Sequence, residues 1–280
     1  MAGGKMSIFI DGHVHIHPGF DLDQMLDAAW DNFSQAAKRL LGDVSACSFV
    51  LLLAEGKKND FFSTLVARAG EGNRSGKSSW EFRLTEEENS VFAIREGKSI
   101  VLIAGRQLIS RENLELLSLF CPHVFADNTY SLGELAERVV EEGGLPLLTW
   151  GVGKWFGRRG RLVQDFLAHP SIPAFLVGDN GNRPGCWPYP TLLLQAEKQG
   201  ILSLAGSDPL PLASHAFRAG SCGGWIKDVD LDGKKMANGL KEILSSEVKI
   251  LPFGQGPGLL QFICDQVQVN LRKRLGRDGC

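Results

Sequence analysis

Residues 8–18 read IFIDGHVHIHP, and this stretch decides how the fold is interpreted. The stretch begins with an apolar run that has the length of a strand buried on both faces. This run passes into a segment that holds three of the chain's 6 histidines. Side chains alternate along an extended backbone, so His13 and His15 are expected to project to the same side at the carboxyl end of this strand. The sequence therefore predicts two imidazoles that converge on one point.

Strand-length apolar runs and segments of helical period alternate along the rest of the chain. The predicted strands are 7–10, 48–53, 100–104, 124–126, 147–150, 174–177 and 201–205, with 224–229 as a candidate last strand. The predicted helices are 22–41, 112–120, 131–142, 161–168 and 191–199. This order favours an α/β fold, a TIM-like (β/α) barrel of seven or eight strands, with an open doubly wound sheet as the alternative.

Two segments depart from the alternation. Residues 80–84 and 91–95 are typical of antiparallel strands, so we expect 70–98 to be a surface loop followed by an inserted β-meander. Residues 258–275 are expected to form a C-terminal helix that packs outside the barrel through one apolar face. With no linker elsewhere, residues 1–280 are interpreted as one domain.

Composition and charge limit the partners. The chain has 280 residues, 44% of them apolar and 22% charged, which excludes disorder, collagen and coiled coil. A formal net charge of -2 gives no global attraction to nucleic acid or to an anionic membrane, so neither is expected as a partner. The apolar runs are shorter than the roughly 20 residues that span a bilayer, and the first residues do not resemble a secretory signal. We expect a cytoplasmic protein with a small-molecule substrate; whether it forms a homo-oligomer stays open.

A second motif closes a late predicted strand. Residues 204–210 read LAGSDPL, and Asp208 is expected to face the same mouth as the histidines, where it could ligate a metal ion or accept a proton from water. Each motif also has a plainer interpretation. His13 and His15 could be buried and hydrogen-bonded to backbone carbonyls, and an aspartate before proline is often a turn or cap residue. Whether His17 joins as a third ligand is open, because Pro18 turns the chain there.

Taken together, His-x-His after a first strand and Gly-Ser-Asp after a late one resemble the metal-dependent hydrolases of the amidohydrolase superfamily and the related PHP phosphoesterases. The resemblance covers the order of elements over most of the chain. It implies that His13 and His15 are first-strand metal ligands and that Asp208 is the catalytic aspartate, which ligates the metal and activates water. The implied cofactor is a divalent metal ion.

The middle strands depart from that family pattern, because their ends carry no histidine. Either carboxylates complete the metal sphere, with Glu55, Asp127 and Asp179 as candidates, or the ancestral site has decayed. A mixed histidine and carboxylate sphere suits manganese or iron about as well as zinc. Each of these carboxylates could equally be a helix cap or an ion-pair partner.

The predicted mouth also gathers basic and aromatic residues. The candidates for substrate binding are Arg106, Trp150, Lys154 and Arg183, because cations beside aromatic rings can hold a phosphate or carboxylate. Arginines on such loops can equally be solvated and without a ligand. The leading hypothesis is a metal-dependent hydrolase acting on an anionic phosphoester, amide or C–N bond. The alternative is an inactive barrel that binds an anionic ligand or a protein partner.

Overall fold

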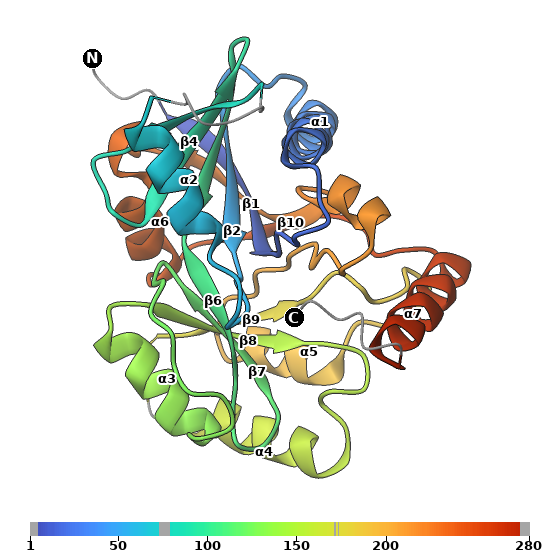
Figure 1. Ribbon diagram of the computed structural model, residues 1–280. Helices are drawn as coiled ribbons and strands as arrows, with labels where there is room; N and C mark the ends of the chain where they lie inside the picture. The colour runs from blue at the N-terminus through green and yellow to red at the C-terminus, as the bar shows by residue number, and fades with distance from the viewer. Residues whose placement is uncertain (1–4, 73–78, 171, 173, 275–280) are drawn as a thin grey trace.

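The structure is a computed structural model that describes residues 5–72, 79–170, 172 and 174–274. Its strands form two sheets (Figure 1). The first sheet has the order β11-β10-β1-β2-β5-β4-β3, with bounds Leu251–Gly254, Cys222–Val229, Met6–Val14, Cys47–Leu53, Lys98–Ile103, Ser90–Arg95 and Glu81–Leu84. The second has the order β6-β7-β8-β9, with bounds Gly105–Ile109, Glu115–Leu119, Leu145–Trp150 and Leu176–Asp179.

The prediction of a TIM-like barrel is wrong: the described residues form a seven-stranded and a four-stranded sheet and no closed barrel. A TIM barrel needs parallel strands joined by helical crossovers. Here β10 runs antiparallel to β1, and β7 runs antiparallel to both β6 and β8. Residues 112–120, predicted as a helix, contain β7, while 124–126 form no strand and 201–205 make only an isolated bridge at Ser203.

The chain passes from the first sheet to the second between β5 and β6, with only Ala104 between the two strands. The next residue is Gly105, where an added Cβ would lie 2.3 Å from the carbonyl oxygen of Leu53 and 2.9 Å from that of Ser118. Glycine is therefore required where the backbones of β2, β6 and β7 meet. An isolated bridge between Glu55 and Arg106 links the two sheets at this point.

Helices surround the two sheets, with α1 and α2 packed on the first sheet and α3, α4 and α5 on the second (Figure 1). Their bounds are Leu22–Leu41 (α1), Phe61–Gly70 (α2), Leu132–Glu141 (α3), Gly157–Ala168 (α4), Thr191–Lys198 (α5), Met236–Leu244 (α6) and Leu259–Arg274 (α7), with 3-10 turns at Ala213–Arg218 (η1) and Gly233–Lys235 (η2). No helix among the described residues has the length and apolar character needed to cross a membrane.

Three hydrophobic clusters fill the spaces between these layers. The first lies between the first sheet and α1, where Phe9, Phe33 and Phe49 pack together. The second joins the two sheets, with Ile10 of β1 and Leu117 of β7 as members. The third lies between the second sheet and α3, α4 and α5. The functional candidates lie where the second cluster ends and buried polar side chains begin.

The C-terminal helix α7 projects from the body of the molecule (Figure 1). The apolar face predicted to pack is exposed: the relative exposures are 80% for Leu260 and 52% for Val267. The opposite side of the helix is anchored instead, because buried Asp265 pairs with His215 at 3.1 Å. The prediction of an apolar packing face on α7 is therefore wrong in orientation.

Candidate metal centre

A β-bulge near the end of β1 aims the two predicted histidines. Asp11 pairs with Leu51 and Val14 with Leu53, so β1 has one more residue than β2 between these pairs. An extra residue reverses the alternation of side chains. Before the bulge Phe9 faces the first cluster, and after it Val14 does. His13 and His15 consequently face the space between the two sheets.

The segment that carries Asp208 lies against β1. Gly12 N donates to Ala205 O at 3.0 Å, and Asp208 N donates to His13 O at 2.8 Å. The two backbones can approach because residue 206 is a glycine: a Cβ there would lie 2.2 Å from the backbone nitrogen of His13. On its other side Gly206 N donates to Asp179 O at 3.1 Å. The Asp208 segment is thus held between β1 and β9.

Asp11 fixes this arrangement from beneath. Its buried carboxylate accepts hydrogen bonds from the backbone nitrogens of His13, Ser207 and Gly220 and from the Ser207 hydroxyl. Burial raises the pKa of Asp11 to about 6, although the four hydrogen bonds oppose this effect. Asp11 therefore connects β1 to the Asp208 segment and to the start of β10.

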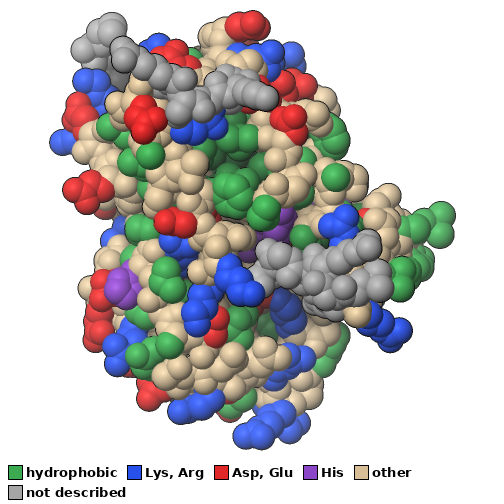
Figure 2. All heavy atoms as spheres, in the orientation of Figure 1, with side chains coloured by type: hydrophobic (Ala, Val, Ile, Leu, Met, Phe, Trp, Pro, Cys, Tyr) green, Lys and Arg blue, Asp and Glu red, His purple; other side chains and the backbone are tan. Residues whose placement is uncertain are grey.

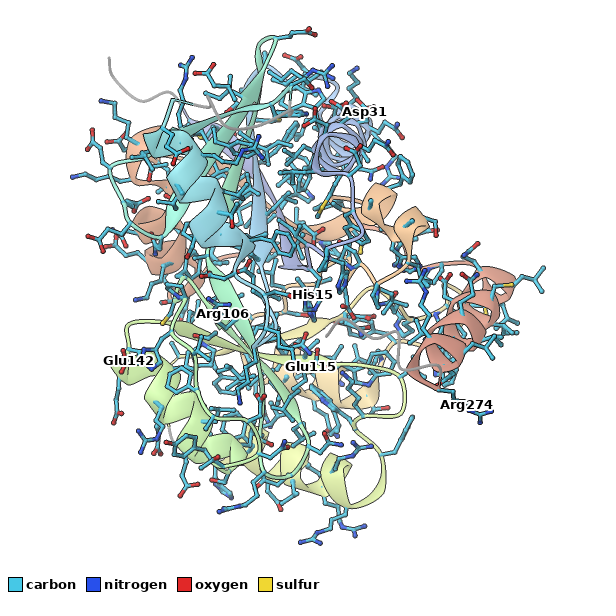
Figure 3. All side chains as sticks on the ribbon, in the orientation of Figure 1. His15, Asp31, Arg106, Glu115, Glu142 and Arg274 are labelled. Carbon is cyan, nitrogen blue, oxygen red and sulfur yellow. The ribbon has the colours of Figure 1, made fainter. Side chains whose placement is uncertain are left out.

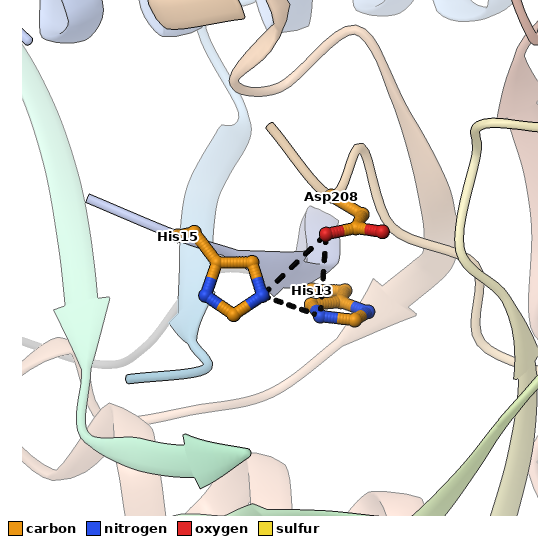
Figure 4. A group of neighbouring side chains, drawn as sticks. All are labelled: His13, His15 and Asp208. Atoms are coloured by element: carbon orange, nitrogen blue, oxygen red, sulfur yellow. Dashed lines mark hydrogen bonds and ion pairs between the residues drawn. The ribbon is translucent and has the colours of Figure 1, made fainter. Parts of the chain in front are cut away.

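His13, His15 and Asp208 meet at one point (Figure 4). The Nε2 atoms of the two histidines are 3.0 Å apart, and Asp208 Oδ1 lies 3.6 Å from His13 Nε2 and 3.4 Å from His15 Nε2. Their ligand atoms all lie within 4.8 Å of one another. These three side chains could hold a metal ion.

The electrostatics of this cluster favour the metal-binding forms of its side chains. Burial lowers the pKa of His15 to about 4, and it lowers that of His13 too; Lys154 adds to both effects. Burial alone would raise the pKa of Asp208, but the imidazoles, Lys154 and Arg218 hold it below its ordinary value. At neutral pH the site therefore presents two neutral imidazoles and a carboxylate, each with lone pairs available for a cation.

A set of amides orients Asp208. Its Oδ2 accepts hydrogen bonds from the side chains of Asn180 and Asn182, each at 2.9 Å, which leaves Oδ1 turned to the histidines. The guanidinium of Arg218 donates to Asn182 Oδ1 and to Gly181 O. Asp208 has a φ of 39°, which L residues rarely adopt, and these contacts hold it there.

Glu115 is a further buried acid at the cluster, and the sequence analysis missed it. Its side chain is 2% exposed, and its Oε1 lies 3.9 Å from His13 Nε2. Its Oε2 forms an ion pair with Lys154 Nζ. Figure 3 shows His15 and Glu115 facing each other from the two sheets. Because β7 is antiparallel to β8, its first residue lies at the same end of the sheet as the carboxyl end of β8.

This end of the molecule is accessible from one side. Figure 2 shows histidine atoms at the bottom of a hollow near the centre of the face, with hydrophobic side chains above and basic ones below. The side chains of Lys154 and His15 are 38% and 12% exposed, whereas that of His13 is 2% exposed. Lys154 and His15 are therefore more open to solvent than His13.

The structure does not bring the other predicted carboxylates into the cluster. Glu55 accepts hydrogen bonds from the backbone nitrogens of Phe61 and Phe62 at the start of α2. Asp179 accepts one from Gly181 N and another from Arg183. Asp127 lies half-buried on the loop after β7. Glu55 thus lies at the start of a helix, and Asp179 is an ion-pair partner of Arg183.

Among the four predicted substrate-binding residues, Lys154 is the one that pairs with Glu115 beside the cluster. Arg106 lies apart from it (Figure 3) and bonds to Pro122 O, Asn59 O and Asp60. Trp150 is buried in the third hydrophobic cluster. Arg183 is bound to Asp179 and to Trp187 O. Arg106 and Arg183 are thus bonded to neighbouring loops and Trp150 to none of the cluster residues by any described contact, and their part in substrate binding stays a prediction.

The remaining histidines near the mouth are committed elsewhere. His17 Nε2 bonds to Pro209 O at 2.8 Å, and its ring stacks on that of His15. His215 accepts a hydrogen bond from Leu210 N through Nδ1 and contacts Asp265 through Nε2. The cluster that could hold a metal therefore contains His13 and His15 and neither of these rings.

Comparison with known proteins gives structural neighbours only. No protein-family model matches the chain. No curated protein matches it either. The crystal structure of PsfC from Pseudomonas syringae PB-5123 has a TM-score of 0.52 at 15% identity, covering 97% of this chain and 98% of PsfC. This likeness shows that the two chains share a fold.

Two structures of Endonuclease Q also match. That of the lesion-specific enzyme from Pyrococcus furiosus has a TM-score of 0.49 at 12% identity, over 89% of this chain and 59% of that one. The other, a complex with a 27-mer duplex substrate containing an abasic lesion, has a TM-score of 0.49 at 12% identity, over 90% and 60% of the two chains. This chain thus spans about three fifths of the length of Endonuclease Q.

These findings bear on two expectations. The exclusion of nucleic acid as a partner does not hold, because a net charge says nothing of local charge at a mouth; the duplex in the matched complex is a substrate of Endonuclease Q. The likeness to PsfC shows a shared fold, and the structure brings His13, His15 and Asp208 of the two motifs together; the amidohydrolase part of the resemblance is not confirmed.

Proposed function

We propose that this chain is a metal-dependent hydrolase that acts on a small anionic substrate at the mouth between the two sheets. One observation carries the proposal: His13, His15 and Asp208 come from segments almost two hundred residues apart, and their ligand atoms face one another in a buried cluster. The bond cleaved is a phosphoester or an amide or other C–N bond. Water supplies the incoming oxygen, and the leaving group takes up a proton.

The donor set fits a divalent ion. Two neutral imidazoles with their Nε2 atoms 3.0 Å apart can share only one proton, so a further lone pair is directed to the same point. Two imidazole nitrogens and one carboxylate oxygen suit zinc, manganese or iron. Such an ion supplies a Lewis acid that polarises the substrate and acidifies water.

The chain's own residues have distinct parts in this proposal. His13 and His15 hold the ion, and Asp208 adds Oδ1 while Asn180 and Asn182 occupy Oδ2. With Oδ2 occupied by two amide donors, Asp208 serves as a ligand with a fixed direction. The surrounding burial excludes bulk water from the inner side of His13.

The test is metal analysis of chelator-treated protein reloaded with zinc, manganese or iron. We expect His13→Ala and Asp208→Ala each to lower metal affinity by about a hundredfold or more, because each removes one of three ligands. His123→Ala is the matched control, since that ring is exposed on the outer surface. Metal retention that is the same in all three variants would overturn these ligands.

Activity is then measured on phosphomonoesters, phosphodiesters, amides and duplex DNA. Nucleic acid belongs in this panel because the net charge does not exclude it. Turnover that requires the metal and is lost in both ligand variants supports the hydrolase. Tight metal binding without turnover of any of these bonds would favour the inactive, ligand-binding alternative.

A further inference from the structure

Lys154 reaches the cluster from a tight turn after β8. Its backbone nitrogen donates to Gly151 O at 2.9 Å. Its aliphatic stem crosses Gly151, where an added Cβ would lie 3.1 Å from Lys154 Cδ and 3.4 Å from Cε. Glycine therefore lets the stem lie flat against the backbone, so that the ammonium group points inward to Glu115.

The partner of this ammonium is a carboxylate that burial would otherwise disfavour. Glu115 is 2% exposed, and a buried carboxylate is tolerated when it is paired. The pair places a positive charge beside the cluster, because the other oxygen of Glu115 lies 3.9 Å from His13 Nε2. The charge of Lys154 acts on His13, His15 and Asp208 alike, lowering the pKa of each.

Further polar groups lie on the same inner face. The hydroxyl of Thr149 is buried and has no hydrogen-bond partner among the described residues, and the Gln107 side chain hydrogen-bonds to the rings of His13 and His15. Leu117 is paired with Leu147 and with Gln107, so Glu115, Thr149 and Gln107 share one face of the second sheet. Buried polar groups are rarely left unpaired unless a ligand or water completes them.

The charges at the site indicate which ligand completes it. With neutral imidazoles, Asp208 and Glu115 contribute two negative charges and Lys154 one positive charge, so one divalent ion gives these groups together a net positive charge, which favours an anion. Without Lys154 the same ion would only neutralise the two carboxylates. The other cation that acts on Asp208 is Arg218, and its guanidinium is already hydrogen-bonded to Asn182 Oδ1 and Gly181 O.

Building on the proposed function, we propose that Lys154, held by Glu115, is the fixed second cation of this centre. The site takes one divalent ion, and Lys154 binds the oxyanion of the ligand beside it. Thr149 and Gln107 lie on the same face of the second sheet as Glu115 and supply hydrogen bonds to that ligand. The class of ligand is a small oxyanion such as a phosphate ester.

The experiment measures Mn²⁺ and inorganic phosphate binding by calorimetry on chelator-treated protein. In Lys154→Gln we expect Mn²⁺ affinity to rise about threefold to tenfold, because a like charge is removed, while phosphate affinity of the Mn²⁺-loaded protein falls about tenfold. Lys154→Arg keeps the charge and is expected to keep phosphate affinity within about threefold of wild type. Lys227→Gln is the matched control, since Lys227 is an exposed lysine at the end of β10 and should change neither affinity.

Opposite changes in the two affinities are the signature that a merely structural lysine would not give. Equal losses of both, an unchanged phosphate affinity, or two Mn²⁺ ions in each wild-type chain would overturn the proposal. If Lys154→Gln lowers the unfolding temperature, the variant Lys154→Gln with Glu115→Gln removes both charges together and is measured instead. A wild-type chain that takes up no Mn²⁺ contradicts the proposed function itself, whereas normal Mn²⁺ uptake with failed phosphate results contradicts only the role of Lys154.

Discussion

The two sides of the mouth differ in how their carboxylates and hydroxyls are paired. On the first-sheet side, Asp11 accepts four hydrogen bonds and Asp208 Oδ2 accepts two, while the Nδ1 atoms of His13 and His17 have no partner among the described residues. On the second-sheet side, the Thr149 hydroxyl has no partner among the described residues, and Glu115 is held by the half-buried Lys154. One side is built to hold its own groups in place, and the other presents groups to a ligand.

This difference separates the tasks of the two sides. Ligands to a metal must be held in a fixed geometry, which is what a satisfied network provides. Side chains that bind a substrate form their hydrogen bonds only when the substrate is bound, so their polar atoms stay unpaired until then. Substitutions on the first side should therefore cost stability and metal affinity together. Substitutions on the second side should change ligand binding with little loss of stability.

The largest expected effect is that of Asp11→Ala. It leaves four donors without their acceptor, so we expect the free energy of unfolding to fall by about 3 to 5 kcal/mol. Metal affinity should fall as well, because the Asp208 segment loses its connection to β1. Urea unfolding and metal titration measure both, with Asp165→Ala on the exposed face of α4 as a control that changes neither by more than about 0.5 kcal/mol. An Asp11→Ala chain as stable as this control would show that the first side is not a cooperative network.

Most of the strands and helices could be predicted because their signals are local. The apolar period of residues 22–41 matches α1, and the apolar runs at 48–53, 100–104 and 147–150 match β2, β5 and β8. The closed barrel could not be excluded, because strand direction depends on turns such as the one between Ser110 and Leu114, whose backbone groups bond to each other. Residues 112–120 have apolar residues at both helical and strand spacing. They form a strand because they pair with β6 and β8, which the sequence of this segment alone does not show.

The wrong prediction of a helix at 112–120 explains why Glu115 was missed. Glu115 was placed on a predicted helix, where a glutamate would be solvated, whereas alternation with Leu117 and Leu119 could have signalled a residue facing inward. His13, His15 and Asp208 were found because their motifs stand out locally. The sequence could not show the β-bulge between Asp11 and Val14, because a bulge is a mismatch with another strand. Asn180 and Asn182 carry no signal that separates them from ordinary loop residues.

Acid should destabilise the metal-free protein through the first side. The pKa of His15 is about 4 in the folded chain and 6.5 when unperturbed, so the unfolded chain binds the proton first as the pH falls from 6.5 to 4. The stability that neutral His15 contributes is present above pH 6.5, and about 3 kcal/mol of it is lost by pH 4. Asp11 acts in the opposite sense between pH 6 and 3.8, because its folded pKa is raised to about 6.

Unfolding of chelator-treated protein between pH 7 and 4 measures this effect. In His15→Gln the loss of stability on acidification should be smaller by about 3 kcal/mol than in wild type. Glutamine does not titrate, so the unfolded chain no longer gains a proton at this position before the folded chain does. His169→Gln is the comparison variant, as that exposed ring lies at the end of α4. A wild-type chain whose stability rises on acidification over this range would contradict the neutral state of the imidazoles.

A smaller effect is expected from the amides that donate hydrogen bonds to Asp208. Asn182→Ala removes one of the two amides on Oδ2 and the acceptor for Arg218, so Asp208 can turn away from the histidines. We expect metal affinity to fall about tenfold, as is common when a group that orients a ligand is removed. Asn238→Ala, at an exposed position in α6, should leave the affinity unchanged. If both variants bind metal equally well, the direction of Asp208 is set by its backbone alone.

The smallest effect gives the sharpest comparison, because it sets one hydroxyl on each side against the other. Ser207 donates to Asp11, so Ser207→Ala should cost about 1 to 2 kcal/mol of stability. Thr149 has a buried hydroxyl without a partner among the described residues, so Thr149→Val, which keeps its shape, should leave stability unchanged or raise it by up to about 1 kcal/mol. Thr149→Val should nevertheless weaken phosphate binding to the metal-loaded protein by a few fold, because the phosphate loses the hydrogen bond that the hydroxyl would give it. Calorimetry and urea unfolding on the two variants measure this, and a Thr149→Val chain that loses as much stability as Ser207→Ala would mean that the second side is satisfied internally and is not waiting for a ligand.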